Sequence, residues 1–134
     1  MKQSVLSILC LLLVSWSINA QQKSIQFDKF TLEDGLSQSS ITSIVQDNFG
    51  FIWVSTQDGI NRYDGYSFLT FKSEQNNESS IPNNYIHCLT KDSKGDIWFG
   101  TNRGIGKINP KTLKITQQFY STRRWRLYLY AINI

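Results

Sequence analysis

The segment Ile41 to Asp64, ITSIVQDNFGFIWVSTQDGINRYD, returns 45 positions later as Ile86 to Asn109, IHCLTKDSKGDIWFGTNRGIGKIN. Eight aligned positions are identical in the two copies: Ile41/Ile86, Asp47/Asp92, Gly50/Gly95, Ile52/Ile97, Trp53/Trp98, Thr56/Thr101, Gly59/Gly104 and Ile60/Ile105. A fixed period of about 40 to 50 residues, filled with β-like runs and turn residues, is typical of β-propeller blades. The repeat therefore predicts an all-β fold of propeller blades with four antiparallel strands each.

Turn residues divide each copy into four short strands. In the first copy we expect strands at Ile41–Gln46, Phe51–Thr56, Ile60–Tyr63 and Tyr66–Phe71. The dipeptide Asp64–Gly65 predicts a type I′ hairpin turn, which needs positive φ at both central residues. No window of comparable length has the 3.6-residue apolar spacing of an amphipathic helix.

Segments on both sides extend the pattern beyond the two copies. Ile25–Leu32 predicts an orphan outer strand that completes a blade formed elsewhere, and Tyr128–Ile134 resembles Tyr85–Lys91 and predicts the first strand of a third copy. We therefore divide the mature chain into an orphan strand and connector at 21–40, repeat one at 41–84, repeat two at 85–127 and a truncated repeat three at 128–134.

This organisation predicts an incomplete propeller of about two blades, the N-terminal fragment of a longer protein. Stacked repeats normally need at least about three units and capped ends to bury their apolar faces. We therefore expect the chain alone to fold poorly, or to associate through exposed strand edges.

Residues 1–20 have the composition of a secretory signal peptide. Lys2 precedes the apolar run Val5–Val14, and Ile18–Ala20 precedes two glutamines at the expected cleavage site. The run is shorter than the roughly 20 residues that a membrane-spanning helix needs. We predict an exported, periplasmic chain that makes no membrane span unless the signal stays uncleaved.

The charge of the chain does not favour a nucleic-acid partner. The formal net charge is +4, but ten basic and ten acidic residues balance between Gln21 and Thr122. No basic face of the kind that binds nucleic acid is indicated. We interpret the basic cluster Arg123–Arg126 as a solvated linker or an aberrant stretch, with contact to a polyanion as the alternative.

The sequence offers no catalytic, metal or cofactor site, and ligand-binding residues stay unassigned. His87 is the single histidine and has no set of Cys, Asp or Glu at ligand spacing, so we interpret it as an ordinary strand residue. Exported Cys88 has no disulfide partner, because Cys10 leaves with the signal. A small buried residue is the expected role of Cys88, with a reactive thiol or an intermolecular bridge as alternatives.

The repeated positions are predicted to be structural and are called the signature positions below: Asp47, Gly50, Ile52, Trp53, Thr56, Gly59, Asp92, Gly95, Ile97, Trp98, Thr101 and Gly104. Asp47 and Asp92 follow a strand at a turn, where an aspartate side chain bonds local backbone. Trp53 and Trp98 are expected to be buried between neighbouring blades, with stacking on a sugar as the alternative. The loop-tip aromatics Phe49 and Tyr66 are freer candidates for such stacking.

The runs Leu32–Ser37 (LEDGLS) and Ile44–Gly65 closely resemble the two-component regulator propeller repeats, and Asp92–Ile105 matches the same pattern less fully. The resemblance implies the periplasmic sensor region of hybrid two-component systems, known especially from Bacteroidetes. In longer members a β-sandwich, a membrane helix, a histidine kinase, a receiver and often a DNA-binding region follow the propellers. The resemblance further implies oligosaccharide ligands, homodimers, and the remaining propeller blades as partners.

Two functions fit this sequence. The preferred one is the N-terminal part of a periplasmic ligand-sensing propeller, non-catalytic by itself, with negligible ligand affinity because several blades would form the site. The alternative is a fragment of an exported propeller enzyme that acts on carbohydrate. Acids or metal ligands on further blades would favour the enzyme, whereas a membrane helix and a kinase would favour the sensor.

Overall fold

The computed structural model describes residues 25–118. The predicted signal peptide, the basic cluster Arg123–Arg126 and the expected third repeat lie outside this range. The described residues form one short 3-10 helix and two four-stranded antiparallel sheets. Their bounds are η1 Leu32–Asp34, β1 Ile41–Gln46, β2 Ile52–Thr56, β3 Gly59–Tyr63, β4 Phe68–Phe71, β5 Ile86–Lys91, β6 Ile97–Thr101, β7 Gly104–Ile108 and β8 Ile115–Gln118. Within 25–118, no helix has the length and apolarity to cross a membrane.

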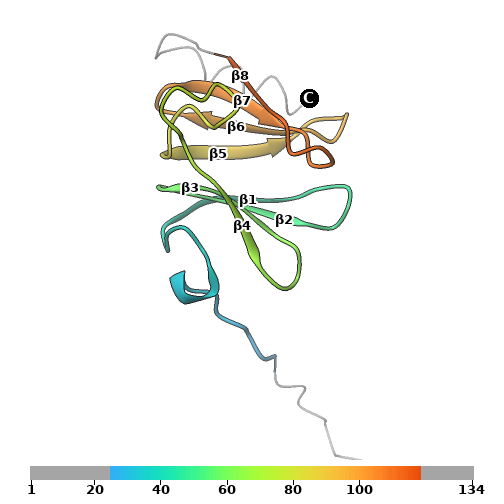
Figure 1. Cartoon of the computed structure of the whole chain (residues 1–134). Coiled ribbons are helices and arrows are strands. Elements are labelled where there is room, and N and C mark those ends of the chain that lie inside the picture. The colour runs from blue at the N-terminus through green and yellow to red at the C-terminus, as the bar shows by residue number, and fades with distance from the viewer. Residues whose placement is uncertain (1–24, 119–134) are drawn as a thin grey trace, which may run out of the picture.

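Each repeat forms one sheet in which consecutive strands are neighbours (Figure 1). The two sheets have the same register: Trp53 lies opposite Val45 and Arg62, and Trp98 lies opposite Thr90 and Lys107. The all-β prediction with four antiparallel strands per repeat is confirmed. We call β1–β4 blade 1 and β5–β8 blade 2.

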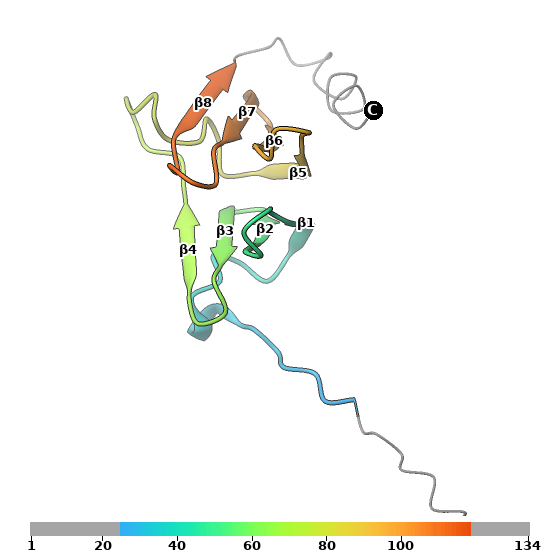
Figure 2. The same ribbon diagram turned by 90° about the vertical axis from the view of Figure 1, so that its right-hand side faces the viewer.

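Blade 2 stacks on blade 1, and the chain crosses between them after β4 (Figures 1 and 2). The main core lies in this interface. It contains the buried residues Trp53, Ile60, Ile81, Ile86, Leu89, Ile97, Phe99 and Ile108, with Val45, Phe71, Leu113 and Ile115 packed against them. Burying one such large apolar side chain contributes about 1.5 to 3 kcal/mol. Stability therefore depends on blade-to-blade contact more than on either sheet alone.

The prediction of a type I′ turn at Asp64–Gly65 is wrong. Of these two residues only Gly65 has positive φ, at 100°. Asp64 Oδ1 accepts hydrogen bonds from the backbone amides of Tyr66 and Ser67, both at 2.8 Å. Because this side chain organises a four-residue loop, Tyr63 pairs with Phe68 and β4 begins two residues later than predicted.

The N-terminal segment also differs from the orphan strand that we expected. Leu32 is not in a strand: it opens η1, where Thr31 and Asp34 form a capping box and Gly35 ends the turn with φ 97°. Residues 25–31 belong to no sheet within the described range. Phe30 instead packs against Tyr63 and Phe68 of blade 1, at centroid distances of 4.8 and 5.5 Å. Pairing of this segment with another blade stays a prediction.

Candidate functional site

The two signature aspartates make the same contacts in each blade. Asp47 Oδ1 accepts the backbone amides of Phe49 and Phe51 at 2.8 and 3.0 Å, and its Oδ2 accepts the indole N–H of Trp53 at 2.8 Å. In blade 2, Asp92 accepts two backbone amides at 2.9 Å and the indole N–H of Trp98 at 2.8 Å. Each carboxylate thus closes the first turn of its blade onto the second strand, and we call this contact the Asp–Trp clamp.

The clamp in blade 2 also sets the protonation of its aspartate. Burial alone would raise the pKa of Asp92, but the hydrogen bonds from Trp98 and from two backbone amides outweigh it, so the pKa is lowered from its ordinary value of 3.8. A lowered folded-state pKa means that the unfolded chain binds the proton more tightly. The stabilisation is therefore present above pH 3.8 and is lost as the pH falls through the folded-state pKa.

Replacing Asp92 by Asn should lower the free energy of unfolding at pH 7 by about 1 to 3 kcal/mol, because the amide nitrogen cannot accept the indole N–H. The difference from wild type should shrink below pH 3.8, where the wild type loses its own carboxylate contacts. Urea titrations from pH 7 to pH 3 measure both effects. Asp28→Asn, at an exposed position, is the control and should change neither. A pH-independent difference would contradict this role of Asp92.

The remaining signature positions shape the later turns and the core. Thr56 Oγ1 accepts the backbone amide of Asp58 at 2.9 Å, and Thr101 does the same for Arg103 at 3.1 Å. The four signature glycines all have positive φ: Gly50 91°, Gly59 125°, Gly95 89° and Gly104 137°. Ile97 is fully buried and Ile52 is half-buried. None of these side chains is presented to solvent as a ligand group.

The tryptophans differ in accessibility. Trp53 is fully buried and stacks on Phe71 with ring centroids 5.6 Å apart, so it is closed to ligands. Trp98 is half-buried, with Lys107 Nζ 5.6 Å from its ring centroid. Phe49 and Tyr66 are exposed, as their positions at loop tips predicted. Neither of them lines the cavity described below.

His87 and Cys88 are neighbours in strand β5. His87 Nε2 lies 2.7 Å from Asn102 Oδ1, and Cys88 is half-buried. Among residues 25–118 no group of three or more His, Cys, Asp and Glu side chains could hold a metal ion.

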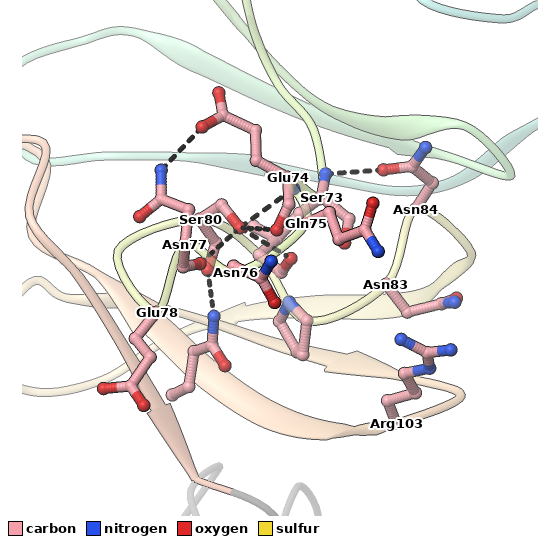
Figure 3. Close-up of a pocket in the computed structure, with 13 residues that line it drawn as sticks. Ser73, Glu74, Gln75, Asn76, Asn77, Glu78, Ser80, Asn83, Asn84 and Arg103 are labelled. Atoms are coloured by element: carbon pink, nitrogen blue, oxygen red, sulfur yellow. Dashed lines mark hydrogen bonds between the residues drawn. The ribbon is translucent and has the colours of Figure 1, made fainter.

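The connector between the blades, residues 73–84, surrounds a polar cavity of about 860 Å³ (Figure 3). Arg103, from the turn between β6 and β7, and Gln117, from β8, complete its lining. The cavity therefore combines a loop that leaves blade 1 with two side chains of blade 2.

Local hydrogen bonds fix the shape of the connector. Ser80 is central: its hydroxyl accepts the amide of Glu74 at 3.0 Å and donates to the carbonyl of Asn77 at 2.8 Å. Asn77 donates from its side chain to Glu74 at 2.6 Å. The next residue, Ile81, is fully buried between the blades and anchors the loop to the core. The hydrogen bonds and the buried Ile81 thus hold the connector in one conformation, and this conformation forms the cavity wall.

Several side chains around the cavity have no hydrogen-bond partner in the described part of the chain. They are the amide groups of Gln75 and Asn76, the carboxylate of Glu78 and the guanidinium of Arg103. Such groups can bind a hydroxylated or charged small molecule through directed hydrogen bonds. None of the lining residues is aromatic, a histidine or a cysteine. The cavity is therefore suited to polar binding and carries no nucleophile with a base beside it.

Sequence reasoning missed this cavity. The sequence analysis assigns no strand to residues 72–84 of repeat one and predicts no folded loop there. A usable signal was present: four asparagines surround Ser80 and the single apolar residue Ile81. Asparagine forms local turns and accepts left-handed backbone, as Asn76 does with φ 61°.

Comparisons with known proteins agree with the geometry of the blades. A family model described as "Two component regulator propeller" matches residues 35–58 and 80–103. "Histidine kinase P4" of Formosa agariphila is 39% identical over 77 residues, which cover 58% of this chain and 6% of that protein. The chain thus spans a small part of this relative.

Two solved structures of extracellular domains are also similar to this chain. The extracellular domain of a proposed hybrid two-component system from B. thetaiotaomicron aligns with a TM-score of 0.65 and 31% identity, over 73% of this chain and 14% of that domain. The extracellular domain of a proposed one-component system from the same organism aligns with a TM-score of 0.52 and 15% identity, over 68% of this chain and 14% of that domain. The second likeness concerns the fold alone.

Proposed function

We propose that this chain forms two blades of the sensor propeller of a two-component regulator, because the two component regulator propeller model matches part of each repeat, at residues 35–58 and 80–103. The propeller would lie outside the cytoplasm, in the periplasm, and would pass a ligand signal to a histidine kinase through changes in domain or dimer packing. The chain itself would be non-catalytic. The remaining blades and a second sensor subunit would be its partners.

The observation that carries this proposal is the combined sequence and structural likeness to the extracellular domain of a hybrid two-component system. Trp53 and Ile97 of the signature positions lie in the core between the blades, and several polar side chains without a hydrogen-bond partner surround the connector cavity. A module with a rigid scaffold and a loop-built polar cavity is suited to recognition.

We further propose that the ligand is a glycan-derived oligosaccharide. The free amides of Gln75 and Asn76, with Glu78 and Arg103, offer the donors and acceptors that sugar hydroxyls need. An aromatic platform is missing from this lining. We therefore expect loops of further blades to complete the site, so that two blades alone bind weakly.

Isothermal titration calorimetry with a panel of oligosaccharides, run on this chain and on an intact receptor of the family, tests the proposal. The intact receptor should bind at least one member with micromolar affinity, and this chain should bind it at least about a hundredfold more weakly. Comparable micromolar binding by both would place the whole site within residues 25–118 and overturn the multi-blade site. Failure of every family receptor to bind any oligosaccharide would overturn the ligand class.

In an intact receptor that carries these two blades as its first repeats, Arg103→Ala should weaken binding by about tenfold, since a charge-assisted hydrogen bond contributes roughly 1.5 to 3 kcal/mol. Lys111→Ala, another exposed basic residue outside the cavity, is the matched control and should bind like wild type. Equal affinities for the wild type, Arg103→Ala and Lys111→Ala would show that this cavity is not part of the ligand site.

A further inference from the structure

An exposed aromatic residue follows the connector directly. Tyr85 is 36% exposed and comes next in the chain after Asn84, which lines the connector cavity. The ring centroids of Tyr85 and His87 lie 5.0 Å apart, and His87 Nε2 forms a hydrogen bond of 2.7 Å with Asn102 Oδ1. Asn102 precedes Arg103, which also lines the cavity. We call Tyr85, His87 and Asn102 the rim cluster, because two of its members are chain neighbours of the cavity lining.

Hydrogen bonds fix the main chain that carries Tyr85. The carbonyl of Asn84 accepts the backbone amide of Gly59 at 2.8 Å, and the side chain of Asn84 donates to Asp58 at 3.1 Å. The backbone amide of Tyr85 donates to Asn83 Oδ1 at 2.9 Å. Because the main chain is held and the ring packs on an imidazole, a ligand that contacts this ring has little ordering left to impose on it.

Neighbouring blades leave the rim cluster accessible. Tyr85 is exposed although blade 1 precedes it in the stack. The residues of blade 1 that align with Tyr85 and Asn102 are Ser40 and Gln57, and both are exposed although blade 2 lies against blade 1. A further blade that packed on blade 2 in the same way would therefore leave Tyr85 and Asn102 open. The rim cluster is thus available to a ligand in a longer propeller as well.

The rim cluster combines an aromatic face with polar groups. The hydroxyl of Tyr85 and the amide nitrogen of Asn102 have no hydrogen-bond partner in the part of the chain that the structure describes. A pyranose ring has a face of C–H groups that packs on an aromatic ring, and its hydroxyl groups need hydrogen bonds. Tyr85 offers the first contact, and Asn102 with Arg103 offers the second.

The charges of the adjoining cavity favour an uncharged ligand. Arg103 is the single basic residue of the cavity lining, and Glu74 and Glu78 line the same cavity. Two carboxylates and one guanidinium leave this lining with a negative balance at neutral pH. A sulfated or otherwise polyanionic ligand would meet repulsion there.

We propose that Tyr85 is a stacking residue of the ligand site, on which one ring of a neutral oligosaccharide lies while the following sugar extends into the connector cavity toward Arg103. This inference rests on the proposed function, since it assigns a residue and a ligand class to the same site. Tyr85 contributes the aromatic contact that the cavity lining lacks. Loops of further blades would add the remaining contacts.

Isothermal titration calorimetry on an intact receptor that carries these two blades tests the inference, with neutral tetrasaccharides of glucose, mannose, galactose or xylose as probes. For a tetrasaccharide that binds, Tyr85→Ala and Tyr85→Leu should each weaken binding about three- to tenfold, because both remove the aromatic face. Tyr85→Phe keeps the ring and should bind like wild type. Tyr66→Ala is the matched control: Tyr66 is 96% exposed, lies at the opposite end of β4 from the connector, and should not affect binding.

The outcomes separate this inference from the proposed function. Wild-type binding that Tyr85→Ala leaves unchanged would overturn the stacking role and leave the ligand class standing. Equal losses for Tyr85→Phe and Tyr85→Ala would also overturn it, because the ring would then not be the group that binds. Binding of charged oligosaccharides alone would overturn the neutral ligand, and binding of none would overturn the oligosaccharide proposal as well. Urea midpoints equal to wild type, expected for substitutions at an exposed position, show that a loss of binding is not a loss of fold.

Discussion

Trp53→Ala should lower the free energy of unfolding by about 3 to 5 kcal/mol, the usual cost of truncating a large buried aromatic. The indole is fully buried in the interface between the blades and stacks on Phe71. Its loss would open a cavity there and leave the carboxylate of Asp47, 4% exposed, without its indole donor. Urea denaturation of an intact receptor carrying these blades, followed by circular dichroism, measures the change.

Trp98→Ala is the matched control within the same repeat pattern. It breaks the equivalent indole hydrogen bond at 2.8 Å but removes a side chain that is only half-buried. When both variants are measured in the isolated chain, Trp98→Ala should therefore cost less than Trp53→Ala. If Trp53→Ala left stability unchanged while ligand affinity collapsed, the structural role of Trp53 would be wrong and stacking on a ligand would be right.

Gly59→Ala should destabilise the protein by about 3 kcal/mol, through two separate effects. Gly59 has φ 125°, where an L side chain is strained, and a Cβ atom there would lie 2.7 Å from the carbonyl oxygen of Phe71. Because that oxygen is main chain in β4, the strand itself must move. Thermal unfolding and urea titration of the variant test this.

Gly50→Ala separates backbone strain from steric contact. Gly50 also has positive φ, at 91°, but a Cβ atom there meets nothing within 4 Å. Only the strain of about 1 to 2 kcal/mol should remain. Equal losses for Gly50→Ala and Gly59→Ala would show that the close approach of β3 to β4 does not limit the residue at position 59.

The repeat in the sequence was sufficient to predict the strands and their order. Aligned turn residues such as Gly50 and Gly95 marked the same boundaries twice, and two copies constrain a boundary better than one. The Asp–Trp clamp was harder to foresee, although both of its residues were among the repeated positions. Pairing Asp47 with Trp53 requires knowing that the turn folds the carboxylate back toward β2.

The predictions of local structure were wrong where hydrogen bonds from a side chain outweighed the preference of the local backbone. The carboxylate of Asp64 accepts hydrogen bonds from two backbone amides, and β3 and β4 are joined by a four-residue loop instead of a two-residue turn. At Leu32 the capping residues Thr31 and Asp34 form a helical turn at the end of the segment predicted to be a strand. The connector cavity depends on contacts between distant positions, such as the side chain of Gln117 with the carbonyl of Ser80, and no local pattern indicates these.

The Asp–Trp clamp has a consequence for how such proteins grow during evolution. Both partners lie six positions apart in one repeat, so a tandem duplication of the corresponding gene segment copies the complete closing device. A newly added blade can then close its own first turn without compensating mutations in older blades. The surfaces between blades are then left for selection to adjust, and there Val45 of the first copy aligns with Thr90 of the second. Blade number can therefore change in whole steps, with the first turn of each added blade already closed.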